Sequence, residues 1–491
     1  MSKKDPLCYN LDMRYRYFFL FLVQFLYAVE NTPIKHLIII FQENRSFDHY
    51  FGIYPRAQNN EKEIPFIVRT GTPSVNGFSK ALLECNQNLN GPYRLSPSQV
   101  DICFPHHDYK ILQEACGRGM MDQFVQTTGK NCHPPASVMG YYDGNTISAL
   151  WNLAQYFAMS DNFHSTVIGQ STAGALNLIS GQTHGATPAE IDGFVYEGTV
   201  INDLDPLYDM DSEGEKISLS GINVGNLLNA KNVRWGFFQG GFADGSLRHE
   251  GPNGFVKDYV PHHNPFQYYA STSNPKHLPP TSLKMVGKQD RANHLYDIEI
   301  FWQAAEIGNV PSVVFLRAPA YQDGHPDNST VLLEQTFLIE TINRLQKLPQ
   351  WKDMAILIAY DDSGGWYDHD MPPNINHSQI PNEDCLTGEG LSGSNPPLGG
   401  YQGRPCYGLR VPLLLISPWA KENFVDQTFT DQTSILRFIE ENWDLGQIGD
   451  FSFDAFAGSI QNMFDFSKKN MRSLYLHPKT GAISQITRSP L

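Results

Sequence analysis

Four short, largely apolar runs constrain the fold of this chain more than any other feature. They span residues 34–41, 313–316, 355–360 and 411–417, and each is rich in aliphatic or β-branched residues. Such runs are typical of strands covered on both faces, and we interpret all four as buried parallel strands. Segments in which apolar residues recur at helical spacing lie between them, over 147–159, 331–348 and 433–443. Strands that alternate with helices predict an α/β fold, with a central, mostly parallel sheet flanked by helices.

Three stretches rich in Gly, Pro, Asn and Asp interrupt this pattern. They cover residues 61–135, 185–285 and 371–408, and we interpret them as long loop insertions rather than as separate domains. One folded unit is therefore expected over residues 33–466. A tail of residues 467–491 follows it.

The N-terminus has the pattern of a secretory signal peptide. Arg14 and Arg16 precede an apolar stretch, residues 17–28, that ends at the small residue Ala28. A basic start, a short apolar core and a small final residue predict a signal peptide over residues 1–28. The apolar stretch is shorter than the roughly 20 residues that a spanning helix needs. We expect a secreted or periplasmic protein; the alternative is a buried or anchoring N-terminal helix.

The cysteines agree with export. Cys8 lies in the leader, and six remain: Cys85, Cys103, Cys116, Cys132, Cys385 and Cys406. An even number suits three disulfides in an oxidising compartment. Pairing between sequence neighbours is favoured, as 85–103, 116–132 and 385–406, and the alternative is a scatter of free thiols.

The formal net charge of -15 argues against a nucleic-acid partner, because phosphate backbones bind basic surfaces.

Two of the predicted strands end in pairs of oxygen-bearing side chains. Glu43 and Asn44 follow the first strand, and Asp361 and Asp362 follow the third. In open α/β sheets ligands sit outside the carboxyl ends of strands, and hard oxygen ligands suit a divalent metal. Each pair alone is equally typical of a turn or a helix cap. Together they predict a metal site.

Ser171 is the candidate nucleophile. It follows a Gly169-Gln170 turn and precedes a helical segment, residues 173–179. A hydroxyl at a helix N-terminus lies near free backbone N–H groups that hold phosphate, and a bound metal would lower its pKa. The alternative role for such a serine is a helix cap.

Histidines in loops supply the third element. His107, His325 and His369 lie near the predicted strand ends, and His262-His263 form a further pair. Imidazoles beside a phosphate bind its oxygens or protonate a leaving group. A lone loop histidine is more often surface. The Gly364-Gly365 pair beside the acidic residues indicates a close backbone approach.

The sequence also resembles a known family. Residues 34–52, IKHLIIIFQENRSFDHYFG, are similar to the opening signature of the bacterial phospholipase C and acid phosphatase phosphoesterases. That family belongs to the alkaline-phosphatase-like superfamily. The resemblance continues in order through most of residues 33–466, which would form the catalytic domain.

The resemblance implies a role for each candidate residue. Glu43, Asn44, Asp361 and Asp362 match the metal ligands, and Ser171 matches the nucleophile that also touches the metal. The implied cofactor is one divalent metal ion, with zinc preferred. Histidines of the phosphate pocket are matched by His107, His325 and His369. The chain departs from the common pattern at three places, Gln170, Ala173-Gly174 and Gln432, which leaves the choice of substrate open.

The resemblance implies a secreted, metal-dependent phospholipase C. It would cleave phosphatidylcholine-type lipids at a transiently contacted membrane surface and release diacylglycerol and a phosphorylated head group. An acid phosphatase acting on phosphomonoesters is the first alternative, and an inactive secreted binding protein is the second. Four loop aromatics are candidates for a cage around a quaternary ammonium, although core packing is their commoner role: Tyr268, Tyr269, Trp366 and Tyr367.

Overall fold

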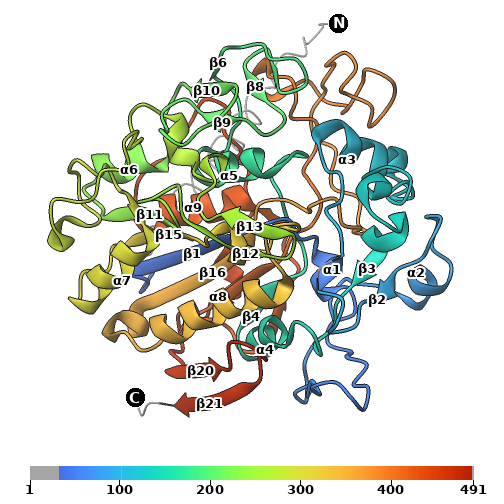
Figure 1. Cartoon of the computed structure of the whole chain (residues 1–491), viewed down its shortest axis with the longest axis horizontal. Coiled ribbons are helices and arrows are strands. Elements are labelled where there is room, and N and C mark those ends of the chain that lie inside the picture. The colour runs from blue at the N-terminus through green and yellow to red at the C-terminus, as the bar shows by residue number, and fades with distance from the viewer. Residues whose placement is uncertain (1–31, 101, 489–491) are drawn as a thin grey trace, which may run out of the picture.

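The computed structural model describes residues 32–100 and 102–488 (Figure 1). The predicted signal peptide, residues 1–28, lies outside the described residues, so the prediction stays as it stands. No helix in the described part of the chain is both long enough and apolar enough to cross a membrane.

An eight-stranded sheet forms the centre of the molecule (Figure 1). Its strands, from one edge to the other, are β14 (Leu295–Asp297), β11 (Trp235–Gln239), β15 (Val313–Arg317), β1 (His36–Gln42), β16 (Met354–Tyr360), β17 (Leu413–Ile416), β4 (Ala158–Ser160) and β18 (Phe424–Asp426). The first five strands are mutually parallel. The sheet confirms the predicted α/β class. The prediction that residues 411–417 form a parallel strand is wrong, because β17 runs antiparallel to both β16 and β4.

Helices cover the sheet on its two faces. Figure 1 shows α7 (Ile298–Glu306) and α8 (Val331–Leu345) in front of it, and α4 (Ser148–Tyr156) contacts α8. A second pair, α5 (Ser171–Ser180) and α9 (Gln432–Asn442), packs together. Both faces of β1 and β16 are therefore buried, which is why these strands carry unbroken aliphatic runs.

Two helix boundaries illustrate what apolar spacing can and cannot define. The predicted start of α9 holds, because Asp431 caps it by accepting from the backbone of Thr433. The helix predicted over 147–159 ends early, since α4 stops at Tyr156 and the next residues form β4. A fully buried apolar segment has no polar face to distinguish helix from strand.

The remaining elements lie in the connecting segments. They are α1 (Phe47–Phe51), α2 (Lys80–Glu84), β2 (Tyr93–Arg94), α3 (Tyr109–Ala115), β3 (Gly140–Tyr141), β5 (Phe163–His164), β6 (Ala186–Thr187), β7 (Val195–Tyr196), β8 (Thr199–Val200), β9 (Asp205–Pro206), β10 (Lys216–Leu219), α6 (Val224–Ala230), β12 (Arg248–Gly251), β13 (Gly254–Lys257), β19 (Thr430–Asp431), β20 (Arg472–Leu476) and β21 (Ile483–Arg488). The segment 185–285 also supplies β11 to the central sheet, so it contributes to the core as well as to loops. In the C-terminal segment β20 pairs with β21, and β20 packs against α8.

One disulfide joins two cysteines of the first long connection. Cys103 and Cys132 are bonded, with their Cα atoms 5.2 Å apart. The predicted 85–103 and 116–132 pairs are therefore wrong, and Cys385 and Cys406 are free thiols, as are Cys85 and Cys116. Sequence proximity misled the prediction because disulfide pairing depends on the distance between Cα atoms in the fold.

Candidate active site

The register of the sheet brings the two acidic pairs together. Gln42 at the end of β1 lies opposite Tyr360 at the end of β16, and the strands are parallel. The residues that follow, Glu43 and Asp361, therefore leave the sheet side by side at its carboxyl edge. Asn44 then folds over the edge, with its backbone N–H donating to Asp361 Oδ1 at 2.9 Å.

Ser171 lies against these side chains. Its Oγ donates to Glu43 Oε2 at 3.0 Å and lies 3.4 Å from Asp362 Oδ2. Asn44 Nδ2 donates to Ser171 Oγ at 3.3 Å and to Asp362 Oδ2 at 3.0 Å. All five predicted residues of the metal and nucleophile set thus form one cluster, at 0–2% exposure.

Two glycines permit this close packing. A Cβ at Gly364 would lie 2.6 Å from the carbonyl oxygen of Asn44, and Gly364 also has a positive φ of 60°. A Cβ at Gly174, on the helix that carries Ser171, would lie 2.4 Å from the carbonyl oxygen of Asp361. The helix that carries Ser171 therefore touches the backbone of the acidic pair directly.

The cluster has the donor set of a divalent metal site. Asn44 Oδ1 and Asp361 Oδ2 are buried and accept no hydrogen bond from the described residues. Burial, followed by the charge of Asp361, raises the pKa of Asp362 well above its ordinary value. Carboxylate and amide oxygens converge here without enough hydrogen-bond donors to satisfy them. A hard divalent cation bound among these oxygens would supply the missing positive charge. The residues present therefore fit the metal that the resemblance implies.

Arg317 is a site residue that our sequence reasoning missed. It ends β15, the strand next to β1, and its side chain is 1% exposed. One guanidinium nitrogen forms an ion pair with Glu43 Oε1 and lies 3.6 Å from Asp361 Oδ2. An arginine that ends an otherwise apolar strand was the signal available in the sequence. Its charge offsets part of the carboxylate excess.

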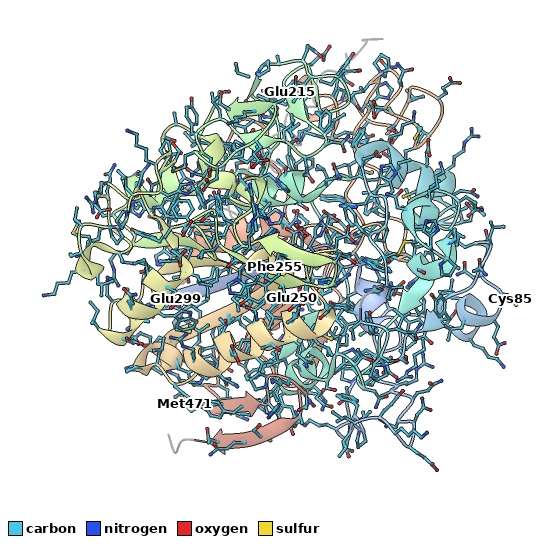
Figure 2. All side chains as sticks on the ribbon, in the orientation of Figure 1. Cys85, Glu215, Glu250, Phe255, Glu299 and Met471 are labelled. Carbon is cyan, nitrogen blue, oxygen red and sulfur yellow. A yellow bond between two sulfur atoms is a disulfide. The ribbon has the colours of Figure 1, made fainter. Side chains whose placement is uncertain are left out.

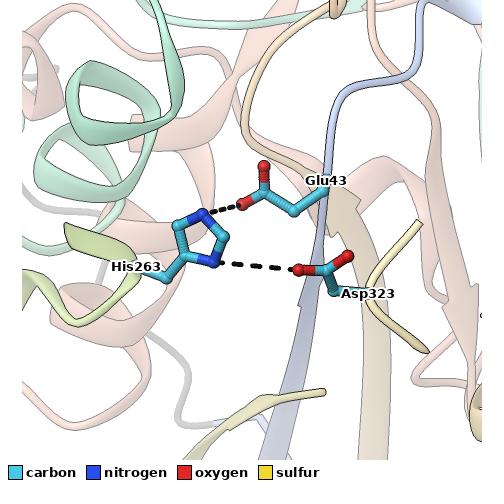
Figure 3. A group of neighbouring side chains, drawn as sticks. All are labelled: Glu43, His263 and Asp323. Carbon is cyan, nitrogen blue, oxygen red and sulfur yellow. Dashed lines mark ion pairs between the residues drawn. The ribbon is translucent and has the colours of Figure 1, made fainter. Parts of the chain in front are cut away.

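His263 and Asp323 extend the cluster on the side of Glu43 (Figure 3). The imidazole lies between two carboxylates, with Nε2 3.2 Å from Glu43 Oε1 and Nδ1 3.8 Å from Asp323 Oδ2. Burial lowers the pKa of His263 well below its ordinary value, and burial raises that of Asp323 to about 8. The sequence showed His263 only as one of a loop pair, and nothing in it singled out Asp323.

His107 and His325 lie near enough to this cluster for the charge of Asp361 to act on both imidazoles. Each imidazole has its Nδ1 at a backbone carbonyl, that of Pro105 at 3.0 Å for His107 and that of Pro326 for His325. Burial lowers the pKa of both, to about 3 for His325, while the charge of Asp361 acts in the opposite direction. Both are neutral at pH 7, and the Nδ1–H donated to the carbonyl leaves Nε2 as an acceptor.

The structure places His369 in a different cluster. Its Nδ1 lies 2.6 Å from Asp48 Oδ2, and its Nε2 lies 3.3 Å from Asn76 Oδ1. Arg410 completes this second group through ion pairs with Asp48 and Asp368. Burial lowers the pKa of His369, but the charge of Asp48, its hydrogen bond to the imidazole and the charge of Asp368 together raise the pKa overall. No described contact joins His369 to Ser171 or its carboxylates, contrary to our placement of this histidine in the phosphate pocket.

The three departures from the family pattern have local explanations. Gln170 Oε1 accepts from the backbone N–H of Asp203 at 3.1 Å, and Asp203 Oδ1 accepts from the N–H of Thr172 at 2.8 Å. The start of α5 is thereby tied to a neighbouring loop. Gln432 donates to the carbonyl of Asp361. Gly174 allows the contact with Asp361 described above.

The four aromatics considered as a cation cage are buried. Tyr268, Tyr269, Trp366 and Tyr367 are 0–4% exposed, and Tyr268 donates to the carbonyl of Leu204. Trp366 stacks on His49, with ring centroids 4.0 Å apart. They are core residues.

The amino-acid sequence matches the model of the Phosphoesterase family over residues 34–446. The chain belongs to that family. The match confirms the resemblance seen in residues 34–52. A phosphoric ester hydrolase is the class of activity that this membership supports, and a dependence on metal accords with the oxygen cluster around Ser171.

Relatives of this phosphoesterase carry the name phospholipase C. Non-hemolytic phospholipase C of Burkholderia pseudomallei is 25% identical over 426 residues, which cover 84% of this chain and 55% of the relative. The chain thus spans about half the length of that relative. Phospholipase C A of Mycobacterium tuberculosis is 24% identical over 483 residues, covering 93% of this chain and 82% of the relative. Non-specific phospholipase C6 of Arabidopsis thaliana is 24% identical over 420 residues, covering 80% and 64%.

Among solved structures, a protein in the alkaline phosphatase superfamily from Vibrio parahaemolyticus is similar, with a TM-score of 0.36 and 9% identity. The likeness covers 94% of this chain and 84% of that one. A TM-score of this size carries no argument, and the fold rests on the sheet topology given above.

Proposed function

We propose that this phosphoesterase is a phospholipase C that cleaves phosphatidylcholine-type lipids, with Ser171 as the nucleophile. The observation that carries the proposal is the contact of Ser171 Oγ with Glu43 and Asp362 in a buried, oxygen-lined cluster. The names of the relatives support the phospholipase activity. The metal-binding set would be Glu43, Asn44, Asp361 and Asp362, together with Ser171, and zinc is our preferred ion.

The chain's own residues account for the first half-reaction. Ser171 Oγ already donates to Glu43 Oε2, so the hydroxyl proton has an acceptor as Oγ attacks phosphorus. The bond from Oγ to phosphorus forms, the bond from phosphorus to the glycerol oxygen breaks, and that oxygen takes a proton from solvent water to leave as diacylglycerol. A divalent ion in this site supplies Lewis-acid stabilisation of the phosphoryl oxygens and lowers the pKa of the hydroxyl.

The second half-reaction returns the enzyme to its starting state. Water attacks the phosphorus of the phosphoserine, and the bond to Ser171 Oγ breaks, which releases the phosphorylated head group. Oγ takes back the proton that Glu43 holds. Neutral His107 and His325 each present Nε2 as an acceptor, which suits them to take the proton of the attacking water. Arg317, next to Glu43, offsets negative charge that develops at the site.

We also propose that the protein works outside the cytoplasm, in contact with membrane surfaces. The Cys103–Cys132 disulfide supports this, because disulfides persist in oxidising compartments. The signal-peptide pattern of residues 1–28 supports it independently.

The test compares two substrates and one variant. Purified protein is incubated with phosphatidylcholine and, separately, with p-nitrophenyl phosphate, alongside Ser171→Ala. Both assays are repeated after chelation and after return of zinc. We expect phosphocholine release by the wild type and none by the variant or by the chelated enzyme.

Two outcomes would redirect the proposal. Hydrolysis of p-nitrophenyl phosphate without phosphocholine release would assign an acid phosphatase to the same site. Inactivity toward both substrates with every metal tried would favour a binding protein built on this fold.

A further inference from the structure

The two chain segments that carry the proposed metal ligands are bonded to each other along their length. The first segment, residues 43–48, follows β1, and the second segment, residues 361–369, follows β16; each begins with two of the four ligands. Hydrogen bonds between them run from Asn44 N–H to Asp361 Oδ1 (2.9 Å), Arg45 N–H to the carbonyl of Asp362 (3.0 Å), Ser46 Oγ to the carbonyl of Tyr367 (2.8 Å) and Asp48 N–H to Asp368 Oδ2 (3.2 Å). The spacing of the two ligand pairs therefore depends on how firmly the segments are held together.

His369 closes the far end of this run of bonds. Its backbone N–H donates to Asp48 Oδ2 at 2.8 Å, and its ring Nδ1 lies 2.6 Å from the same oxygen. Arg410, on a third segment, donates to Asp48 Oδ1 and to Asp368 Oδ2, each at 3.2 Å. Each of the two segments thus contributes one carboxylate to this group. Both carboxylates and Arg410 are 0% exposed, so their charges must be balanced within the group.

The hydrogen-bond geometry gives His369 a positive charge. Nδ1 faces a carboxylate oxygen of Asp48, and Nε2 lies 3.3 Å from Asn76 Oδ1. The amide of Asn76 is oriented by its other end, because Nδ2 donates to Asp370 Oδ2 at 2.9 Å. An imidazole whose two nitrogens both face acceptors carries both protons, and the raised pKa of His369 agrees with this charge. Arg410 Nη2 lies 3.2 Å from the ring, so two cations share two buried carboxylates and the group is neutral.

The ring of His369 reaches a cavity on the outside of the molecule. Its side chain is 13% exposed and lines a space of about 250 Å³, whose wall also includes Cys85, at the outer edge of the molecule in Figure 2. None of the described residues that line this cavity belongs to the cluster around Ser171. An effect of His369 on that cluster therefore passes through the two segments and not through contact with a substrate.

We propose that His369 is a positioning residue for the metal site: its imidazolium holds the carboxylates of the two segments together and so sets the spacing of the two ligand pairs. The inference rests on the metal set of the proposed function. Without the imidazolium, two buried carboxylates share one guanidinium, and the segments that carry them repel each other. The ligand pairs then move apart, and the site binds its divalent ion less tightly.

The test measures zinc binding without substrate. His369→Asn removes the positive charge but keeps an amide N–H close to the position of Nδ1. The double variant Asp48→Asn/His369→Asn removes one charge of each sign and so restores the balance. His477→Asn is the matched control, at an exposed histidine in the C-terminal segment. Calorimetry gives the dissociation constant of zinc for each protein, and thermal unfolding of the metal-free protein shows that each is folded.

We expect the dissociation constant of zinc to rise about tenfold or more in His369→Asn, and to return to within about threefold of the wild type in the double variant. His477→Asn should match the wild type. An unchanged dissociation constant in folded His369→Asn, even with a lower melting temperature, would overturn the inference. A double variant that binds zinc as weakly as the single variant would also overturn it.

A second measurement decides the matter if His369→Asn does not fold. Nitrogen NMR of ¹⁵N-histidine-labelled wild type reports the protons on each ring, and a neutral His369 at pH 7 would overturn the inference. The proposed function fails separately. A wild type that binds zinc as described but cleaves neither ester would refute that function and leave the inference standing, whereas a wild type that binds no divalent ion would overturn the metal set and the inference together.

Discussion

Gly174 offers a sharp test of how Ser171, the proposed nucleophile, is positioned. In Gly174→Ala the new Cβ would lie 2.4 Å from the carbonyl oxygen of Asp361 and 2.8 Å from its carbonyl carbon. Ordinary contacts begin near 3.4 Å, so the start of α5 and the end of β16 must separate by about 1 Å. Both partners are backbone atoms, and neither can rotate away as a side chain would.

This displacement should cost far more activity than stability. A misplacement of about 1 Å costs roughly a hundredfold in rate, because Ser171 loses its alignment with the carboxylates. Overpacking destabilises by about 1–3 kcal/mol, whereas alanine gains about 1 kcal/mol over glycine inside a helix. The net loss of stability is therefore about 0–2 kcal/mol.

The assay is kcat/KM on p-nitrophenyl phosphate, together with thermal unfolding of the same preparations. Gly388→Ala is the control, because a Cβ at Gly388 meets no atom within 4 Å. We expect the control to match the wild type in both measurements. Wild-type activity in a folded Gly174→Ala protein would refute the claim that this contact sets the position of the nucleophile.

Three further predictions follow from charge and covalent links. Asp362→Asn should reduce kcat at least about a hundredfold and lower the amount of bound zinc measured by elemental analysis. The same variant should raise the melting temperature of the metal-free protein, because burial raises the pKa of Asp362 and so disfavours its charged form in the folded state. A lower melting temperature would contradict this. Replacing both cysteines of the Cys103–Cys132 disulfide by serine should lower the free energy of unfolding in urea by about 3–4 kcal/mol, since the bond closes a loop with a sequence separation of 29. The control Cys85→Ser, at an exposed free thiol, should leave the free energy of unfolding unchanged. Burial and a neighbouring carboxyl raise the pKa of Glu440 to about 10, so the folded state holds the proton more tightly than the unfolded state does. The free energy of unfolding should therefore fall as pH rises from about 4.5 to 10, by up to about 1.4 kcal/mol per pH unit. Glu440→Gln should flatten that slope, and an unchanged slope would count against the raised pKa of Glu440.

The sequence predicted the strands that build the site because their burial requires long aliphatic runs. β1, β15 and β16 lie close to the predicted ranges, and the acidic pairs follow two of them as expected. The clustering of Glu43, Asn44, Asp361 and Asp362 then follows from parallel pairing, which brings strand ends to one edge. The proximity of Ser171 to them also agrees with expectation.

Contacts between segments distant in sequence could not be predicted in the same way. His263 and Asp323 reach Glu43 from connections whose course no local pattern defines. His369 follows Asp361 closely in sequence, yet its chain turns away and binds Asp48. Disulfide pairing failed for the same reason, since it depends on the path of the loop between residues 103 and 132.

The role of Ser171 is the central claim, and trapping the covalent intermediate tests it most directly. Wild-type protein with zinc is mixed with excess p-nitrophenyl phosphate, quenched in acid within the first turnovers, digested and examined by mass spectrometry. We predict phosphate on the peptide that contains Ser171, and none in Ser171→Ala or in chelated enzyme. Rapid hydrolysis with that peptide unmodified at every quench time, or with phosphate on a different residue, would contradict the account.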